Sequence, residues 1–280
     1  MKKELDEIIL LIGQTRDDDL SQYDTAFLLR TIETRMSVTG ISSPKEYGSF
    51  LLENNPEIDL LFQSLQISYS EFFRNQLTFS LLEQHVLPGL IAAKQKNGTE
   101  IRIWSAGCAA GQEAYSVAIL LDEMTADLAE KVPFRIFATD RSYSELDSAQ
   151  KGVYDAAAVR NVRLKHLEKY FSKNNDSYLL NDCLKKTVNF SLFDLLDQNS
   201  ISPPASIYGD FDIVFCSNLL FYYRPETRQL VLDKVSRSLS AEGVLVTGEA
   251  EISIVEKHGG FASFAKPSAL FRKTTHRGTR

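Results

Sequence analysis

The sequence has little of what secreted, membrane-spanning and nucleic-acid-binding proteins usually carry. Its 280 residues include only three cysteines, an odd number at wide spacing, which predicts no disulfide framework and favours a reducing cytoplasm. No apolar run approaches the roughly 18–20 residues that cross a bilayer. The start, "MKKELDEIILLIGQTRDDD", is interrupted by acids and predicts a helix rather than a signal peptide, without membrane insertion. A net charge of −6 argues against a nucleic-acid partner, which needs a basic surface.

Motifs for binding metals and phosphates are also missing from the sequence. The four histidines are scattered without the spacing of metal ligands, so we expect no metal site. The chain has neither a phosphate loop with Gly-Lys-Ser/Thr nor a complete G-x-G-x-x-G dinucleotide fingerprint. What is present is the composition of an ordinary globular protein, with 44% hydrophobic and 24% charged residues.

The first third of the chain has helical patterns. "SQYDTAFLLRTIETRM" places apolar residues at helical spacing, and "SSPKEYGSFLLENN" opens with Ser-Pro and has Glu46 where a capping box needs it. No strand pattern precedes residue 100. We therefore expect residues 1–90 to form a small helical domain and a connecting helix pair, closed by Pro88 and by Asn97-Gly98.

After residue 100, short apolar runs alternate with helical stretches. This alternation predicts an α/β domain over residues 91–280, with a mostly parallel sheet covered on both faces. The expected strands are 100–106, 134–140, 187–193, 211–217 and 243–249. The interval before residue 187 is too long for a loop and predicts a small inserted subdomain near residues 155–187. Within it, "RLKHLEKYF" predicts a helix and "DSYLLNDCLKK" a small hairpin or subdomain.

The stretch "IWSAGCAAGQEAYSVAIL" predicts a strand, a glycine-bounded turn and a helix. Gly107 and Gly111 bracket small residues that let a ligand lie against the backbone at the carboxyl end of the first strand. The next strand ends in Asp140, whose carboxylate can accept both hydroxyls of a ribose. Because the phosphate-binding motifs are missing, a nucleoside without a phosphate fits this turn best. S-adenosylmethionine is the obvious candidate cofactor.

Seven stretches, in their order and spacing, carry a resemblance that covers nearly the whole chain. They are "SYSEFFRN" (68–75), "IWSAGCAAGQEAYSVAI" (103–119), "FATDRSYSELDSAQKGVYD" (137–155), "YFSKN" (170–174), "VNFSLFDLLD" (188–197), "FDIVFCSNLLFYYRPETRQ" (211–229) and "GVLVTGEAE" (243–251). The chain resembles the CheR family of chemoreceptor glutamate methyltransferases. The resemblance implies a Rossmann-like S-adenosylmethionine methyltransferase sheet with a small N-terminal all-helical domain.

The resemblance also implies the reaction and the partner. The family moves a methyl group from S-adenosylmethionine to glutamate side chains of chemoreceptor cytoplasmic domains, so the expected partner is an acidic protein. A carboxylate is already an anion at neutral pH and needs no general base. This agrees with a sequence that has no obvious acid/base pair, and catalysis would rest on alignment and loss of water.

Individual roles follow from the matching positions. Arg74 and Tyr222 match residues at the family's methyl-transfer centre, and Asp194 and Leu195 match a pair near the adenine. With Gly107 and Asp140 from the turn, the expected cofactor-binding residues are Ser68, Ser70, Arg74, Gly107, Glu113, Asp140, Asp194, Leu195, Ser217 and Asn218. Each also has an ordinary structural explanation. Arg74 could pair with Glu71, Tyr222 could be a packing residue, and Asp194 could cap a turn.

Several positions depart from the family pattern. Gln112 replaces an acid, Ser217 replaces an arginine, and the basic helix expected to face an acidic receptor keeps only Arg30 and Arg35. These departures leave two alternatives beside glutamate methylation. One is a degenerate homologue that binds the cofactor or a receptor without methylating it, and the other is a methyltransferase for another carboxylate.

Overall fold

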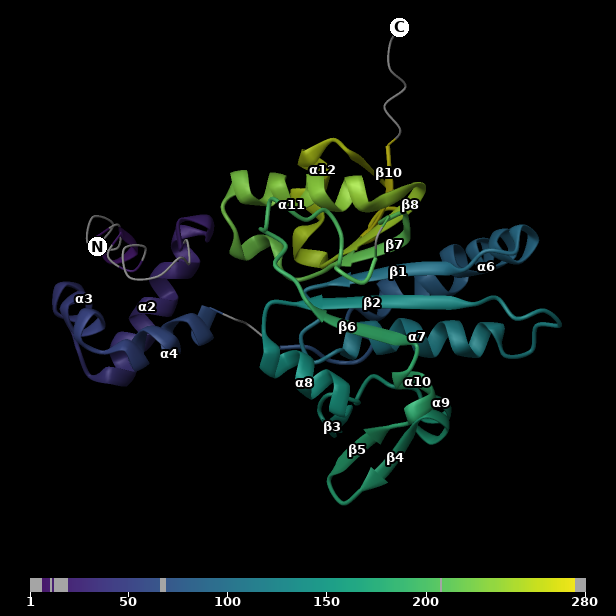
Figure 1. Ribbon diagram of the computed structural model, residues 1–280, viewed down its shortest axis with the longest axis horizontal. Coiled ribbons are helices and arrows are strands. Elements are labelled where there is room, and N and C mark those ends of the chain that lie inside the picture. Colours follow the sequence, from purple (N-terminus) through teal and green to yellow (C-terminus); the bar gives the residue numbers. More distant parts are fainter. Residues whose placement is uncertain (1–6, 11, 13–19, 66–68, 207, 275–280) are drawn as a thin grey trace, which may run out of the picture. The chain divides into compact units, whose positions relative to one another are not determined.

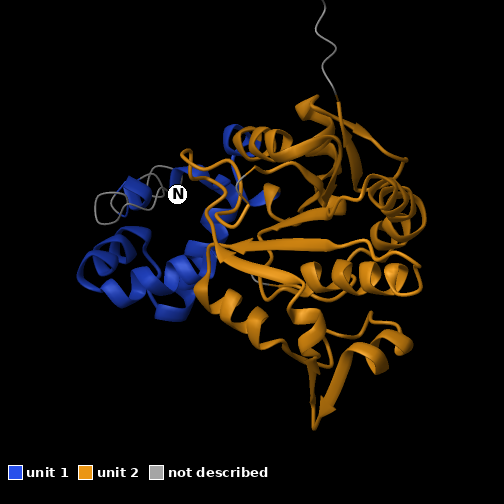
Figure 2. Ribbon diagram, turned by 45° about the vertical axis from the view of Figure 1, so that its right-hand side comes forward, with its two compact units in different colours: residues 1–67, 221–228 blue, residues 68–220, 229–280 orange. Residues whose placement is uncertain are grey.

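The chain divides into two compact units in a computed structural model that describes residues 7–10, 12, 20–65, 69–206 and 208–274 (Figure 1). The first unit, which we call the helical unit, contains residues 1–67 and 221–228; the second, the α/β unit, contains residues 68–220 and 229–280 (Figure 2). Most of the helix expected at the start of the chain lies outside the described residues, as does Ser68. No helix within the described ranges is long and apolar enough to cross a membrane.

The helical unit forms because its helix starts are strongly capped. It contains η1 (Leu20–Gln22), α2 (Thr25–Thr39), α3 (Pro44–Glu53) and α4 (Asn55–Leu65). The side chain of Asp24 accepts hydrogen bonds from two backbone N–H groups of α2. Ser43, which directly precedes Pro44, accepts one from the backbone N–H of Glu46. The buried faces of α2 and α3 both pack on α4. The predicted Ser-Pro helix opening is confirmed.

A segment from far along the sequence completes the helical unit. Tyr223 forms an antiparallel bridge with Tyr23, and the N–H of Asp24 donates to the carbonyl of Tyr222 at 2.8 Å. The N–H and the Nε of Arg224 donate to Gln22 and Tyr23 carbonyls at 3.0 Å each. The sequence patterns did not predict this pairing, and it makes the helical unit discontinuous in the chain.

The expected helix break at Pro88 is wrong. Helical structure continues through α5 (Gln76–Leu81), a π-helical turn (Leu82–Val86) and α6 (Leu87–Asn97), and ends at Gly98 with φ +63°. Pro88 lies in the first turn of α6, directly after the wider turn. A proline is tolerated there because the change of helical register already removes the regular hydrogen bond that its missing N–H would have donated.

The core of the second unit is a seven-stranded sheet in the order β6-β2-β1-β7-β8-β10-β9. Its strands are β1 (Ile101–Ala106), β2 (Phe134–Asp140), β6 (Val188–Leu192), β7 (Phe211–Cys216), β8 (Leu239–Thr247), β9 (Phe261–Ser263) and β10 (Leu270–Lys273). The first five are parallel, and β10 and β9 join antiparallel at one edge. The five predicted strands and the mostly parallel α/β sheet are confirmed.

Helices cover both faces of this sheet because alternate strand residues point to opposite sides. Ile103 packs in one buried cluster with residues of α6, α7 (Gln112–Thr125) and α8 (Tyr143–Lys151). Its neighbour Trp104 packs in the other cluster, with residues of α11 (Pro225–Ser238) and α12 (Ile252–His258). The carboxyl ends of the parallel strands therefore lie at one edge of a sandwiched, rigid layer.

Between α8 and β6 the chain forms a second, three-stranded antiparallel sheet in the order β3-β5-β4. The sheet strands are β3 (Val153–Asp155), β4 (Phe171–Asn174) and β5 (Ser177–Leu180), and the helices of this insertion are α9 (Leu164–Tyr170) and α10 (Asp182–Lys185). The predicted helix over residues 163–171 is present. The hairpin starts earlier than expected, at Phe171, because the turn falls at Asn175, which adopts φ +52°.

Candidate functional site

The glycine turn after β1 is fixed by its own geometry. Gly107 and Gly111 adopt φ +76° and +85°, values that glycine tolerates best. A Cβ on Gly111 would lie 3.0 Å from both Ala149 and the ring of Phe190, so the turn also needs glycine for close packing. The backbone N–H of Gly107 donates to the carbonyl of Thr139 at 2.8 Å, which joins the ends of β1 and β2.

Asp140, at the end of β2, connects the turn to the next helix. One carboxylate oxygen accepts the N–H of Ala109 and the other accepts the N–H of Ser142, both at 2.9 Å. Burial raises the pKa of Asp140, and these hydrogen bonds oppose the shift. Each carboxylate oxygen has a second lone pair, so the same group can still accept ribose hydroxyls.

Glu113 lies in the first turn of α7 and is half-buried between polar partners. Its Oε1 accepts the hydroxyl of Ser105 at 2.7 Å. Burial raises its pKa to about 7, with a smaller contribution from the charge of Glu251; hydrogen bonds from Ser105 and Ser217 and the charge of Arg74 act in the opposite direction. A cationic ligand group beside this carboxyl would favour its ionised form.

Arg74 lies on a strained loop near Glu113. Phe73 and Asn75, its neighbours in the chain, have φ +52° and +61°, which is uncommon for residues other than glycine. The N–H of Phe73 donates to the hydroxyl of Ser116 on α7 at 2.9 Å. Arg74 itself donates to the carbonyl of Tyr69 at 2.9 Å, with its guanidinium over that ring. Half-buried Ser70 lies on the same loop.

Arg74 does not pair with Glu71, the ordinary explanation considered for it. Glu71 is instead bound by Arg160 of the insertion, at 2.7 Å. The guanidinium of Arg74 therefore remains directed at its own loop, and its charge still acts on Glu113.

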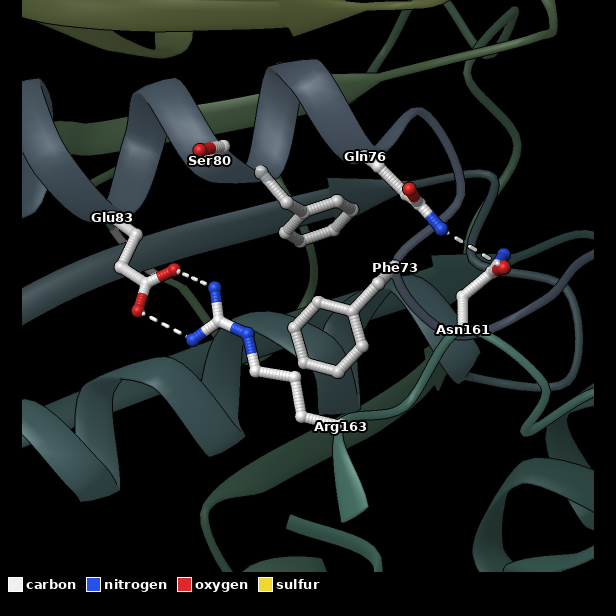
Figure 3. A pocket seen from close by; sticks show the side chains of 7 residues that line it. Phe73, Gln76, Ser80, Glu83, Asn161 and Arg163 are labelled. Carbon is white, nitrogen blue, oxygen red and sulfur yellow. Dashed lines mark hydrogen bonds and ion pairs between the residues drawn. The ribbon is translucent and has the colours of Figure 1, made fainter. Parts of the chain in front are cut away.

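The insertion holds the far side of this loop through polar pairs around a small pocket (Figure 3). Gln76 donates to the side-chain carbonyl of Asn161 at 3.1 Å. The guanidinium of Arg163 binds both oxygens of Glu83, at 2.7 and 2.5 Å. The ring of Phe73 lies between these two pairs (Figure 3). These pairs join the insertion to the helical segment that directly follows the loop with Arg74.

Asp194 and Leu195 follow β6. The side chain of Asp194 is exposed and accepts the N–H of Leu196 at 2.8 Å, as a turn-capping residue does. Leu195 is buried in the cluster around Trp104. The buried Lys234 donates to the carbonyl of Asp197 at 2.5 Å and fixes the same turn. The ordinary role considered for Asp194 is thus present, and its contact with adenine stays a prediction.

Ser217 and Asn218 follow β7, and the residue that holds them is one that the sequence patterns did not identify. The N–H of Asn218, which adopts φ +59°, donates to the buried carboxylate of Glu251 at 2.8 Å. "GEAE" was noticed only as a departure from the family. Only the structure shows that Glu251 is buried, and a buried acid needs hydrogen-bond donors around it.

Tyr222 belongs to the helical unit, where its ring centroid lies 4.8 Å from that of Phe27 and its carbonyl accepts the N–H of Asp24. The packing role considered for Tyr222 is therefore present, and its catalytic role stays a prediction. Ser68 lies outside the described residues.

The residues around the turn fit S-adenosylmethionine. Gln112 is buried at the start of α7, and its side-chain oxygen has no hydrogen-bond partner among the described residues. It is an acceptor available to a ligand N–H, directly beside Glu113. With Asp140 placed for hydroxyl groups, the site combines acceptors for a ribose and for a cationic amino-acid tail. The replacement of an acid by Gln112 keeps an acceptor while removing one charge.

Comparison with known proteins gives the family. The all-alpha domain of CheR methyltransferases matches residues 3–65, and their S-adenosylmethionine-binding domain matches residues 68–267. The chain is 30% identical over 255 residues to "Chemotaxis protein methyltransferase" of Borreliella burgdorferi, covering 89% of this chain and 88% of the relative. It is 34% identical over 197 residues to "Chemotaxis protein methyltransferase 1" of Pseudomonas aeruginosa, covering 69% of each. The chain therefore belongs to the CheR methyltransferase family and is an S-adenosylmethionine-dependent methyltransferase.

Proposed function

We propose that this enzyme methylates glutamate side chains of a protein, and that the protein is the cytoplasmic domain of a chemoreceptor. The names of its relatives refer to chemotaxis. The observation that carries the proposal is the position of Arg74, a half-buried cation whose neighbour Phe73 is hydrogen-bonded to Ser116 in the same helix as Glu113. A cation there suits an acceptor that arrives as an anion.

The residues of the site divide the work of the reaction. When bound, S-adenosylmethionine supplies an electrophilic methyl group. Asp140 would hold the ribose, and Gln112 and Glu113 would hold the amino-acid tail. Arg74 would orient the acceptor carboxylate, which needs no proton removed at neutral pH. The strained, supported loop fixes Arg74 in advance, so alignment and exclusion of water provide most of the rate enhancement.

Of the two basic residues that α2 keeps, we expect only Arg30 to be available to an acidic substrate. Arg35 is held by the buried carboxylate of Glu57, at 2.9 and 2.7 Å. Arg30 is exposed, with its Nε donating to the carbonyl of Ala26 at 3.2 Å. The expectation that Arg35 belongs to a receptor-facing surface is therefore replaced by a structural role within the helical unit.

Labelling tests the proposal directly. The enzyme would be mixed with tritiated S-adenosylmethionine and chemoreceptor cytoplasmic fragments, and base-labile methyl ester on glutamate would be counted. We expect labelling by the wild-type enzyme, and a loss of about 100-fold in Arg74→Ala because transition-state alignment is lost. Arg74→Lys is the matched variant, since it keeps the charge without the planar fork and should retain part of the activity.

Other outcomes identify the alternatives. Binding of S-adenosylhomocysteine without any methyl ester would indicate a degenerate homologue. Label on another carboxylate in a cell extract, with none on receptor fragments, would indicate a different substrate. Absence of calorimetric binding of S-adenosylhomocysteine at high micromolar concentration would contradict the cofactor site itself.

A further inference from the structure

We infer that Glu251 is a positioning residue that fixes the Ser217–Leu220 segment in the geometry needed for cofactor binding and methyl transfer. Glu251 is the last residue of η4 (Glu249–Glu251), the short helix after β8, and it is fully buried. The inference rests on the proposed cofactor site, because Ser217 and Asn218 are expected to contact the cofactor there.

The carboxylate of Glu251 is surrounded by hydrogen-bond donors. Oε1 accepts the N–H groups of Leu219 and Leu220 at 2.7 and 2.6 Å. Oε2 accepts the N–H groups of Asn218 and Gly248 at 2.8 and 2.9 Å. The hydroxyl of Thr247 also lies 2.9 Å from Oε2. No ion pair to Glu251 is present among the described residues, so these donors alone offset its burial.

Three of these donors are consecutive N–H groups of the segment that follows β7. Consecutive N–H groups converge on one anion only when the backbone departs from a regular strand, and Asn218 with φ +59° provides that departure. The carboxylate therefore determines the course of the chain directly after Ser217. The hydroxyl of Ser217 donates to the carbonyl of Val246 at 3.5 Å, and Ser217 is also one of the groups that lower the pKa of Glu113 in the cofactor site.

Gly248 shows how closely the two strand ends approach. A Cβ at this position would lie 2.6 Å from the side-chain nitrogen of Asn218 and 2.9 Å from Oε2 of Glu251. Such contacts are not tolerated in a packed interior, so the glycine makes room for the carboxylate and its donors. The ends of β7 and β8 are thus joined through one side chain that is 33 residues from Asn218 in sequence.

Glu251 also acts through its charge. Its negative charge is one of the influences that raise the pKa of Glu113, which also faces Ser105, Ser217 and Arg74. Removing this charge should shift the titration of Glu113 and therefore the pH dependence of ligand affinity, a readout that is separate from a loss of stability.

Three variants test the inference in the full chain. Glu251→Gln keeps the size of the side chain but turns an N–H₂ group toward N–H donors. Glu251→Ala leaves the donors around an empty, anion-sized space. Glu249→Ala, on the exposed side of the same short helix, is the matched control. Affinity for S-adenosylhomocysteine would be measured by calorimetry between pH 5 and 9, together with kcat, KM and thermal unfolding.

We expect both Glu251 variants to lose affinity about 30-fold, because several backbone donors lose their acceptor and the segment changes course. In Glu251→Gln the pH midpoint of binding should also move to lower pH, since a neighbouring negative charge is removed. Excess formate should restore affinity in Glu251→Ala by filling the vacated space, and should have no effect on Glu249→Ala.

Unchanged affinity and an unchanged pH midpoint in a folded Glu251→Gln protein would overturn the inference. Formate that restores the unfolding temperature of Glu251→Ala but not its affinity would do the same, because it would show a purely structural role. If the wild-type enzyme does not bind S-adenosylhomocysteine, the proposed cofactor site itself is wrong. If the wild-type enzyme binds and the Glu251 variants bind equally well, only this inference is wrong.

Discussion

The two units each enclose a glutamate, and they satisfy it in opposite ways. In the helical unit, Glu57 is buried and receives both guanidinium N–H groups of Arg35 and the hydroxyl of Tyr47. In the α/β unit, Glu113 accepts the hydroxyl of Ser105, and the guanidinium of Arg74 donates to the carbonyl of Tyr69 instead. The hydrogen bonds from Arg35 lower the pKa of Glu57, whereas burial raises the pKa of Glu113 to about 7. One carboxylate is paired within the fold, and the other still favours a positive partner from outside.

The largest expected effect is the loss of the paired glutamate. Glu57→Ala should destabilise the helical unit by about 3–5 kcal/mol, because it leaves the Arg35 guanidinium without its buried partner. Hydrogen exchange of α2, α3 and α4 in the full chain measures this. Glu53→Ala, at an exposed position of α3, should change the exchange by less than about 0.5 kcal/mol. Equal effects of the two variants would contradict the structural role of Glu57.

The next effect concerns the other unit and changes binding. Asp140→Ala should weaken S-adenosylhomocysteine binding more than about tenfold, because it removes both the ribose acceptor and the carboxylate that holds Ala109 and Ser142. Isothermal calorimetry measures the affinity. Asp147→Ala, an exposed position on α8, is the control and should bind normally. Unchanged affinity in Asp140→Ala would show that the site lies elsewhere.

A smaller effect concerns Glu113 and is measured through the stability of the protein. The folded-state pKa of Glu113 is raised to about 7 from the usual 4.5 of a glutamate, so the folded protein binds this proton more tightly than the unfolded chain. Its contribution is therefore lost as pH rises from about 4.5 to about 7. In the absence of ligand, Glu113→Gln should stabilise the protein by on the order of 1–2 kcal/mol at pH 8 and by little at pH 4.5.

Urea unfolding at the two pH values measures this difference. Glu130→Gln, an exposed position, should show no such pH dependence. The same Glu113→Gln change should weaken cofactor binding, so stability and affinity should change in opposite directions. A Glu113→Gln protein that is less stable than the wild type at pH 8 would contradict the raised pKa of Glu113.

The smallest effect concerns Gln112. Gln112→Met keeps the buried volume but removes the acceptor without a partner, and should weaken S-adenosylhomocysteine binding by about 2–5-fold. Its stability should not fall, because no hydrogen bond within the protein is lost. Gln150→Met, at an exposed position of α8, is the control. Stronger binding by Gln112→Met would show that the amide does not face the ligand.

The parts of the fold that sequence predicted are those determined by neighbours in the chain. Strands such as Ile101–Ala106 appear as short, mainly apolar runs, Gly111 caps the helix that follows the turn, and Asp140 ends its strand. The contacts that were missed join residues far apart, such as Glu251 with Asn218 and Tyr23 with Tyr223. Nothing in the spacing of a single sequence encodes which distant backbone an acid will bind.

Pro88 was missed for a different reason. Its effect on a helix depends on the turn before it, and the π-helical turn over Leu82–Val86 has no sequence pattern as distinct as a proline. The rule that proline ends a helix holds for a regular α-helix, and the π-helical turn before Pro88 is an exception to it.

The discontinuous helical unit has a consequence for dissecting this enzyme. The family boundary between residues 65 and 68 suggests a single cut, but residues 221–228 supply the partner of Tyr23 and accept the N–H of Asp24. A fragment that ends near residue 67 would lack those partners. A fragment that begins near residue 68 would contain residues 221–228 without Tyr23 and Asp24, to which they bind. The chain passes between the units three times, so no single cut separates one complete unit from the other.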